Sequence, residues 1–327
     1  MATIRDVAKA AGVSIAAVSA CINASAPVSP ALKRRVEAAV AGAGYRPDAL
    51  ARGLKTGATG MLGLAVDGLA DPFTAAVAEA AVQAAAERGY AVLLAGGGDI
   101  AGLEARRVEG ILAMPGPAEG NGRKFRCPLA TVRGASEGFD GVDADFAQMA
   151  EAAVEHLAGL GHRRVALVIG PAHVARGERI LAGYRRALAR HGLSFAPRLV
   201  RVAAPGKAKP GLVQQAQDTA RALLASQDWP SALIVCGGAL ARFMAQAMAQ
   251  AGLACPAGVS IAALGDDGWT RHGAPALTAV AEPARDIGAE AVRLLLGRIR
   301  GKEPMPARDV LLPGALTVRE STAPPAS

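Results

Sequence analysis

From residue 61 onward, short apolar runs alternate with amphipathic stretches of helical length, and this alternation limits the possible folds more than any other feature. The apolar runs are MLGLAVDGL, YAVLLA, VEGILAM, RRVALVIG, LVRVAA, SALIVCG and VSIAAL. The spacing predicts helices over 73–88, 146–160, 178–191, 212–226 and 240–252. Apolar strands that alternate with helices are typical of parallel sheets covered on both faces. A stretch of roughly 260 residues predicts two doubly wound subdomains, with a ligand cleft at the carboxyl ends of their strands.

Residues 1–46 follow a different pattern, which predicts three short helices, the first ending at residue 11 and the others over 15–22 and 31–43. Thr3 and Asp6 have the spacing of a capping box, and Ser14 and Ser29 are good N-caps for the second and third helices. A helix, a turn with glycine and a second helix of about eight residues is the plan of a helix-turn-helix, whose second helix enters the major groove of DNA. A plain three-helix bundle is the alternative that this local pattern leaves open.

The charge of the chain is concentrated in the same segment. The whole chain has a net charge of +8, and residues 1–60 hold eight Lys and Arg against three Asp and Glu. The first 60 residues therefore carry +5 of the +8, which is expected of a small module that binds a polyanion.

Targeting and redox signals are absent from the sequence. Arg5, Asp6 and Lys9 occupy the place where a secretory signal needs an apolar run, and no apolar stretch reaches the roughly 20 residues that span a bilayer. The four cysteines are far apart and show no C-x-x-C spacing, which argues against a zinc site. We expect a cytoplasmic protein with reduced cysteines, no metal and no cofactor.

The N-terminal motif and a series of later motifs resemble the lactose/galactose repressor (LacI/GalR) family. They are TIRDVAKAAGVSIAAVSACIN, VSPALKRRVEAAVAGAGYRPDALARGLK, DPF, LGHRRVALVIG, GYRRAL, VSIAALGDD, PALTAV and IGAEAVRLLL. The resemblance runs through the whole chain in family order. It implies a DNA-binding head, a hinge helix, and an α/β core that is similar to periplasmic sugar-binding proteins, dimerises and binds a small effector.

The resemblance also implies domain limits. The head is expected over 1–46, the hinge and linker over 47–60, and the core over 61–320. We expect the core subdomains to be interleaved, with 61–160 joined by 282–312 and 161–281 joined by 313–320. The polar, proline-rich end, 321–327, predicts a disordered tail.

Residues expected to contact DNA follow by position from this resemblance. The head positions are Thr3, Ser14, Ile15, Ala16, Ala17, Ser19, Ala20, Asn23, Ser29 and Tyr45. Ile15, Ala16 and Ala20 occupy positions at which family members read base edges, often with polar, aromatic or Arg side chains. An alanine lacks the bidentate contact to guanine that is worth about 1–3 kcal/mol. We therefore predict weak direct readout, with A·T-containing half-sites or DNA shape contributing more.

The hinge segment matches the family in one position and departs from it in two. Leu54 occupies the place of a leucine that wedges into the minor groove, flanked by Ala51 and Lys55. Asp48 occupies a position at which Asn or Ser is usual in the family, and Gly53 occupies a position at which Ser is usual. Glycine weakens a helix interior by about 1 kcal/mol, which predicts a hinge helix that folds only on DNA.

The loops that match effector-binding loops of the family supply Asp71, Phe73, Asp143, Asp145, Arg176, Arg179, Asp266 and Trp269. The usual ligand-binding Arg lies three residues before the Gly of GYRRAL, where this chain has Ile180, with Arg179 one residue out of register. Gly238-Ala239 replaces a common Asn-Asp pair, and the stretch AGGGDIAGLEARRVEGIL is shorter than usual. These departures predict an atypical ligand or a regulator without effector control.

Two other classes remain as alternatives. The first is an NAD(P)-dependent enzyme, because the sequence GGGDIA after a strand superficially matches a dinucleotide-binding fingerprint. The helix that follows is too short, however, for a good phosphate-binding N-terminus. Hydrolases are disfavoured, because no G-x-S-x-G elbow is present. A sugar-binding transport component would share the core but needs an export signal and no DNA-binding head. We therefore predict a homodimeric, non-enzymatic transcriptional regulator that acts as a repressor and binds a pseudo-palindromic operator and a sugar-like effector.

Overall fold

A computed structural model of the chain describes residues 2–23, 26–45, 58–114, 125–133, 138–203, 211–225, 229–301 and 306–326. It divides the chain into two compact units, Met1–Gly60 and Met61–Ser327. The expected hinge residues Asp48, Ala51, Gly53, Leu54 and Lys55 lie outside the described residues.

The first unit contains the three helices that the sequence predicts, α1 (Ile4–Ala11), α2 (Ile15–Asn23) and α3 (Pro30–Ala43). The predicted capping box at the start of α1 is confirmed, since the Asp6 amide donates to Thr3 Oγ1 (3.4 Å) and the Thr3 amide donates to Asp6 Oδ2 (2.8 Å). Gly12 ends α1 in the left-handed conformation (φ 61°), which a residue with a Cβ rarely adopts. A small core joins the helices, formed by Val7, Ala8, Ala11, Val18 and Val36.

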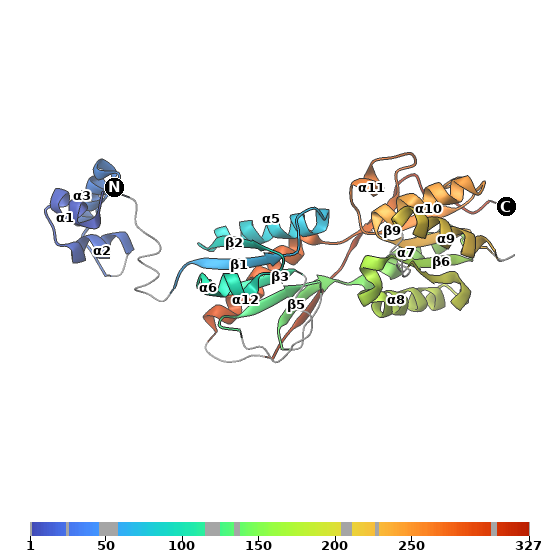
Figure 1. Ribbon diagram of the computed structural model, residues 1–327, viewed down its shortest axis with the longest axis horizontal. Helices are drawn as coiled ribbons and strands as arrows, with labels where there is room; N and C mark the ends of the chain where they lie inside the picture. The colour runs from blue at the N-terminus through green and yellow to red at the C-terminus, as the bar shows by residue number, and fades with distance from the viewer. Residues whose placement is uncertain are drawn as a thin grey trace. The chain divides into compact units, whose positions relative to one another are not determined.

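The second unit contains two six-stranded sheets, joined by three segments of chain (Figure 1). The first sheet has the order β11-β5-β4-β3-β1-β2, and all its neighbouring strands are parallel. Its strands are β1 (Met61–Val66), β2 (Ala91–Gly96), β3 (Gly110–Met114), β4 (Leu129–Val132), β5 (Asp140–Ala144) and β11 (Asp309–Leu312).

Alternate side chains of β1 enter two different clusters, as expected for a strand with both faces buried. Leu62, Leu64 and Val66 pack with α5 (Pro72–Ala86) and α12 (Ala284–Arg300), while Ala65 packs with the short α6 (Ile100–Ala105). Helix α12 is also tied to the sheet by Asp140, whose buried carboxylate pairs with Arg298 (2.7 Å) and Arg308 (3.1 Å).

The second sheet has the order β12-β10-β9-β8-β6-β7, in which only the β10–β12 pair is antiparallel. Its strands are β6 (Val165–Ile169), β7 (Val200–Val202), β8 (Ala232–Cys236), β9 (Ser260–Leu264), β10 (Thr278–Ala281) and β12 (Ala315–Thr317). Helices α7 (Phe146–Gly159) and α8 (Gly177–Arg190) cover one face, and α9 (Leu212–Leu224) and α10 (Gly238–Gln250) cover the other. Short helical turns are η1 (Pro171–Arg176), η2 (Pro197–Leu199) and α11 (Gly268–Arg271).

Helix α7 corrects one expected subdomain limit. The sequence analysis placed the limit at residue 160 and so assigned this helix to the first subdomain. The helix packs instead against α8 and the strands of the second sheet, and Gly183 of α8 approaches it so closely that a Cβ there would overlap the carbonyl oxygen of Ala147. The chain therefore passes from the first sheet to the second near residue 145.

The end of the chain is ordered, so the expected disordered tail over 321–327 is wrong for the described residues up to 326. The hydroxyl of Ser321 is buried and donates to the Ile261 carbonyl oxygen (2.6 Å). The Ala323 amide donates to Ser260 Oγ (3.0 Å), and the Ala323 carbonyl oxygen lies 2.9 Å from Nε2 of the buried His162. These bonds fix the tail along the second sheet, an outcome that its polar composition does not predict.

Candidate functional site

The second helix of the head presents the expected base-reading positions to solvent. Ile15 begins α2 and is 44% exposed, and Ala16 beside it is also exposed. Ala17, Ser19 and Ala20 are partly buried. An exposed, apolar start of α2 is the surface that the sequence predicts for weak direct readout.

Three of the hydroxyl side chains expected near DNA cap helices. Thr3 caps α1, Ser14 Oγ accepts from the Ala17 amide (3.2 Å), and Ser29 Oγ accepts from the Leu32 amide (3.3 Å). Their side chains are exposed, as a phosphate contact requires. A helix N-terminus with its free amides also suits an anion.

The remaining head positions give less information. Tyr45 is partly buried and packs against the head core. The side chain of Asn23 and the hinge residues Ala51, Leu54 and Lys55 are outside the part of the chain that the structure describes.

In the second unit, Asp71 and Phe73 hold an arginine that the sequence analysis did not select. Arg133, directly after β4, pairs with Asp71 Oδ2 through Nη2 (2.9 Å), and its guanidinium lies 4.1 Å from the centre of the Phe73 ring. Arg133 has φ 64°, in the left-handed region that a side chain other than glycine rarely adopts. Strained backbone of this kind is common at ligand sites, where surrounding contacts maintain it.

Arg176 is held in the same way by residues at the end of β5 and the start of α7. Its Nε donates to Asp143 Oδ2 (2.8 Å), and its guanidinium lies 5.1 Å from the centre of the Phe146 ring. The Arg176 side chain is only 11% exposed and that of Asp143 only 2%. Because Asp143 belongs to the first sheet and Arg176 follows a strand of the second, this buried ion pair connects the two subdomains.

His173 lies beside both arginines. Its ring centre is 5.7 Å from that of Phe146, and burial together with Arg176 and Arg133 lowers its pKa to about 4. The imidazole is therefore neutral at pH 7. In the described residues, four buried side-chain polar atoms lack a hydrogen-bond partner, and three of them are Arg133 Nε, His173 Nδ1 and Arg176 Nη2.

Glu282 completes this group, which we call the two-arginine cluster: Asp71, Phe73, Arg133, Asp143, Phe146, His173, Arg176 and Glu282. Glu282 follows β10, where the chain returns from the second sheet to the first. Burial raises the pKa of Glu282 to about 7, although Arg133 and Arg176 act in the opposite direction. A carboxyl that titrates near neutral pH beside two arginines is typical of a functional site.

Two other expected effector residues are used differently. Arg179 lies away from this cluster, pairs with Asp309 (3.0 Å) and is 40% exposed, while Ile180 beside it is fully buried in the core. Asp145 caps α7, because its Oδ1 accepts from the amides of Ala147 and Gln148.

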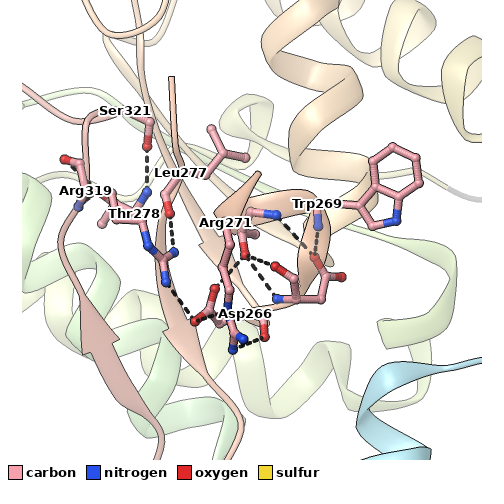
Figure 2. Close-up of polar contacts among 9 residues, drawn as sticks. Asp266, Trp269, Arg271, Leu277, Thr278, Arg319 and Ser321 are labelled. Carbon is pink, nitrogen blue, oxygen red and sulfur yellow. Dashed lines mark hydrogen bonds and ion pairs between the residues drawn. The ribbon is translucent and has the colours of Figure 1, made fainter. Parts of the chain in front are cut away.

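Asp266 is committed to an internal network (Figure 2). Thr270 Oγ1 donates to Asp266 Oδ1 (2.6 Å), while Arg271 Nε (3.2 Å) and Arg319 Nη2 (2.8 Å) donate to Oδ2. Burial opposes ionisation, but the hydrogen bonds from Arg319 and Thr270 outweigh it and lower the pKa of Asp266. Both carboxylate oxygens are thus occupied before any ligand arrives.

Trp269 is the most exposed of the expected effector residues. Its side chain is 51% exposed, and Figure 2 shows the indole pointing away from the Asp266 carboxylate. Its ring centre lies 5.7 Å from that of Phe243, on α10. The structure therefore brings together Asp71, Phe73 and Arg176, but not Trp269 or Asp266, with the cluster.

Sequence reasoning missed Arg133, Phe146, His173 and Glu282 as site residues. Arg133 and Glu282 each directly follow a short apolar strand, β4 or β10, that the pattern along the chain did not reveal. Since ligands of parallel sheets bind at the carboxyl ends of strands, a charged residue in that position was the available signal.

Neither a metal centre nor a membrane span stands out in what the structure describes. The described residues contain no gathering of three His, Cys, Asp or Glu side chains suited to a metal ion. None of the described helices has the length and apolar character needed to cross a bilayer.

Two family models match the chain. The model of the bacterial regulatory proteins of the lacI family matches residues 3–48, and the model of the periplasmic binding protein-like domain matches residues 154–322. The first match covers the three helices of the head, and the second covers all strands of the second sheet together with α12 and β11 of the first subdomain.

Curated relatives match over nearly the whole chain. The ribose operon repressor of Escherichia coli is 31% identical over 315 residues, which cover 91% of this chain and 93% of that protein. The HTH-type transcriptional regulator PtxS of Pseudomonas aeruginosa is 31% identical and covers 98% of this chain and 96% of its own.

Solved structures agree in fold. The Lac repressor dimer bound to operator and the anti-inducer ONPF has a TM-score of 0.80 at 24% identity, covering 98% of this chain and 99% of that one. The complex of the transcriptional regulator CelR with cellobiose has a TM-score of 0.65 at 26% identity, covering 98% of this chain and all of that one.

Proposed function

The chain belongs to the lacI family of bacterial regulatory proteins, and from this premise we propose that a small molecule bound at the two-arginine cluster changes its affinity for operator DNA. One observation carries the proposal: three buried nitrogens without partners, on Arg133, His173 and Arg176, lie in one cluster that spans both subdomains. A buried donor or acceptor without a partner costs about 1–3 kcal/mol, so a ligand that hydrogen-bonds to these atoms recovers that free energy.

The position of the cluster explains how binding reaches the DNA. Arg133 follows a strand of the first sheet and Arg176 a strand of the second, so a ligand that bonds both favours one arrangement of the subdomains. A ligand shifts a conformational equilibrium only by its difference in affinity for the two states. The hinge over 47–60 is where we expect that shift to alter the folding of a helix on DNA.

The proposed DNA interface is the exposed start of α2 together with the helix caps. Thr3, Ser14 and Ser29 place hydroxyls and helix N-termini for phosphates, and Ile15 and Ala16 provide only apolar contacts for base edges. The hinge residues Ala51, Leu54 and Lys55 are proposed contacts to the minor groove. Specificity then comes largely from DNA shape and from thymine methyl groups.

Selection of bound sites in vitro tests the interface. We expect pseudo-palindromic sites, since the proposed active form is a homodimer with one head per half-site, as in the Lac repressor dimer on its operator. We expect a weak base preference opposite Ala20. A strict guanine requirement at that contact would contradict the proposed readout.

Operator affinity tests the effector. The recovered site is titrated with the full chain in the presence of a panel of sugars and sugar derivatives, and at least one compound should change the Kd about tenfold or more. Arg176→Gln should abolish the change while operator binding itself remains. A protein that ignores the whole panel supports the alternative of a regulator without effector control.

The proposed function assigns no catalysis to the chain and places it in the cytoplasm, where operator DNA is found. A transport component remains the second candidate class, and its prediction is opposite: ligand binding without any specific DNA site. Site selection therefore separates the two classes directly.

A further inference from the structure

Building on the proposed function, we propose that the effector carries a carboxylate, and that Arg133 and Arg176 bind this group together. Three features of the cluster support a carboxylate: the way the two arginines are held, the donor atoms that remain without a partner, and the balance of the surrounding charges.

The two arginines are held by matching arrangements at the starts of two helices. Asp71 and Phe73 stand at the N-terminus of α5 and fix Arg133. Asp143 and Phe146 stand just before and at the N-terminus of α7 and fix Arg176. In each case a carboxylate and an aromatic ring set the plane of the guanidinium, and arginine fixed in this way is suited to planar oxyanions.

The buried side-chain atoms of the cluster that lack a partner are nitrogens. The neutral His173 supplies one donor and one acceptor, but Arg133 Nε and Arg176 Nη2 are donors only. Asp71 Oδ2 already accepts from Arg133 and Thr74.

The second carboxylate is also in use. Asp143 Oδ2 accepts from Arg176, and Asp143 Oδ1 accepts from the Ala144 amide (3.0 Å). A hydroxyl ligand can accept from the same donors, but it also brings a proton, for which acceptors such as Glu282 and the neutral His173 ring remain in the cluster. A carboxylate brings only lone pairs, and so matches the two open arginine donors.

The charges of the cluster favour a single negative charge over two. Asp71 and Asp143 already balance the two arginines, so a carboxylate adds one negative charge to the cluster and a phosphate dianion adds two. The N-termini of α5 and α7, helices of 15 and 14 residues, lie at this point and favour an anion.

Glu282 gives the binding a proton signature. It faces Arg133, Arg176, Asp143 and Asp71, and burial raises its pKa to about 7. A carboxylate held by the same arginines raises that pKa further, because it is a like charge and takes up the arginines' donors. Binding at pH 7 should therefore take a proton from the solvent.

Calorimetry on the full chain with matched probes tests the inference. The acids are D-gluconate, D-ribonate and D-galactonate, the neutral partners are D-glucose, D-ribose and D-galactose, and D-glucose 6-phosphate is the dianion. We expect at least one acid to bind at least about tenfold more tightly than its neutral partner and than the phosphate, as for a hydrogen bond to a charged group. The heat should differ between buffers of different ionisation enthalpy by an amount that corresponds to proton uptake.

Variants connect the binding to the two arginines. Arg133→Gln and Arg176→Gln should each weaken the acid about 10- to 100-fold and leave the neutral sugars unchanged. Arg285→Gln is the control, because Arg285 is 75% exposed, pairs only at the surface with Glu79, and lies on α12. Arg133 is the more exposed of the two arginines, so Arg133→Gln reports on binding even if Arg176→Gln fails to fold.

The outcomes separate this inference from the proposed function. A neutral sugar that binds as well as its acid, or an acid that ignores Arg133→Gln, overturns the carboxylate assignment and leaves effector control intact. No binding by any acid at millimolar concentration also overturns the assignment. Effector control itself fails only if no compound of any class changes operator affinity.

Discussion

Replacing Glu282 with glutamine should stabilise the core at alkaline pH and have no effect at acid pH. The pKa of Glu282 is raised from an ordinary value of 4.5 to about 7, chiefly by burial. The folded chain therefore holds this proton more tightly than the unfolded chain. The contribution of the group to the free energy of unfolding is fully present below pH 4.5 and is lost as the pH rises through 7.

The size of the effect follows from the two pKa values. Ionised Glu282 at pH 8 lowers the free energy of unfolding by about 3 kcal/mol relative to the protonated form. Glutamine has the shape of the protonated acid and cannot ionise. Glu282→Gln should thus exceed the wild type by less than about 1 kcal/mol at pH 5 and by about 3 kcal/mol at pH 8, the latter equivalent to a Tm about 5 °C higher.

Tryptophan fluorescence during urea unfolding is a suitable measurement, because both tryptophans of the chain, Trp229 and Trp269, lie in the second unit. Glu79→Gln, which removes an exposed surface carboxylate, is the matched control and should show no comparable dependence on pH. The reasoning is refuted if Glu282→Gln differs from the wild type by the same amount at pH 5 and pH 8, or is the less stable protein at pH 8.

Three further predictions concern packing and capping. Gly183→Ala should destabilise the core by about 2 kcal/mol or more in urea unfolding, because the new Cβ overlaps the backbone of α7. The control is Gly159→Ala, where a Cβ meets open space, and it should be neutral or slightly stabilising in the same titration. Asp140→Asn should cost about 3 kcal/mol in urea unfolding, since it leaves two arginine partners of a buried carboxylate uncompensated; a cost below 1 kcal/mol would show that the pair contributes little. Thr3→Ala should remove about 1 kcal/mol from α1, seen as about fivefold faster amide exchange in the head with no change in the core.

The sequence predicts where the helices and strands of this fold lie along the chain better than it predicts which elements pack against one another. Helix α7 was expected over 146–160 and is found over Phe146–Gly159, yet its pattern does not show which sheet it packs on. The sheet on which α7 packs is decided by tertiary contacts. One of them joins Ala147 of α7 to Gly183 of α8, and these two residues are 36 positions apart in the sequence. Local periodicity reports a buried face and leaves its partner undetermined.

The tail shows the same limit for composition. STAPPAS has the polar and proline-rich character of a disordered end, but its small side chains and free backbone groups complete hydrogen bonds of the second sheet. Ser321 and Ala323 bond to Ile261 and Ser260, residues some 60 positions earlier. Composition averages over a segment, whereas these bonds depend on two particular positions.

Some site residues could be predicted from the sequence, and others could be identified only from the structure. Asp71, Phe73 and Arg176 were found because the family motifs place them, while Arg133 and Glu282 follow strands too short to be predicted from their pattern. The structure identifies those two by burial, ion pairing and the pKa of Glu282, quantities that exist only once the sheets have formed.

The cluster also bears on the interpretation of Ile180. At the position where the family resemblance predicts a ligand-binding arginine, this chain has a fully buried isoleucine, which on sequence alone favours a regulator without effector control. Arg176, one helical turn earlier, instead sends a guanidinium to Asp143 and Phe146. Arg176 thus provides a buried guanidinium between the subdomains without an arginine at position 180, and we infer that ligand binding has been kept.

The energetics favour the same conclusion. Three buried nitrogens without partners cost about 1–3 kcal/mol each, a large share of the 5–15 kcal/mol by which a typical domain is stable. In a site that no longer binds a ligand, substitutions that remove these unpartnered atoms would raise stability without loss of function and would be tolerated. Such a site therefore has no reason to retain the unpartnered atoms. A site that still binds a ligand retains these atoms because the ligand supplies the missing hydrogen-bond partners. The unpaired atoms of Arg133, His173 and Arg176 thus argue for effector control more strongly than the missing arginine at 180 argues against it.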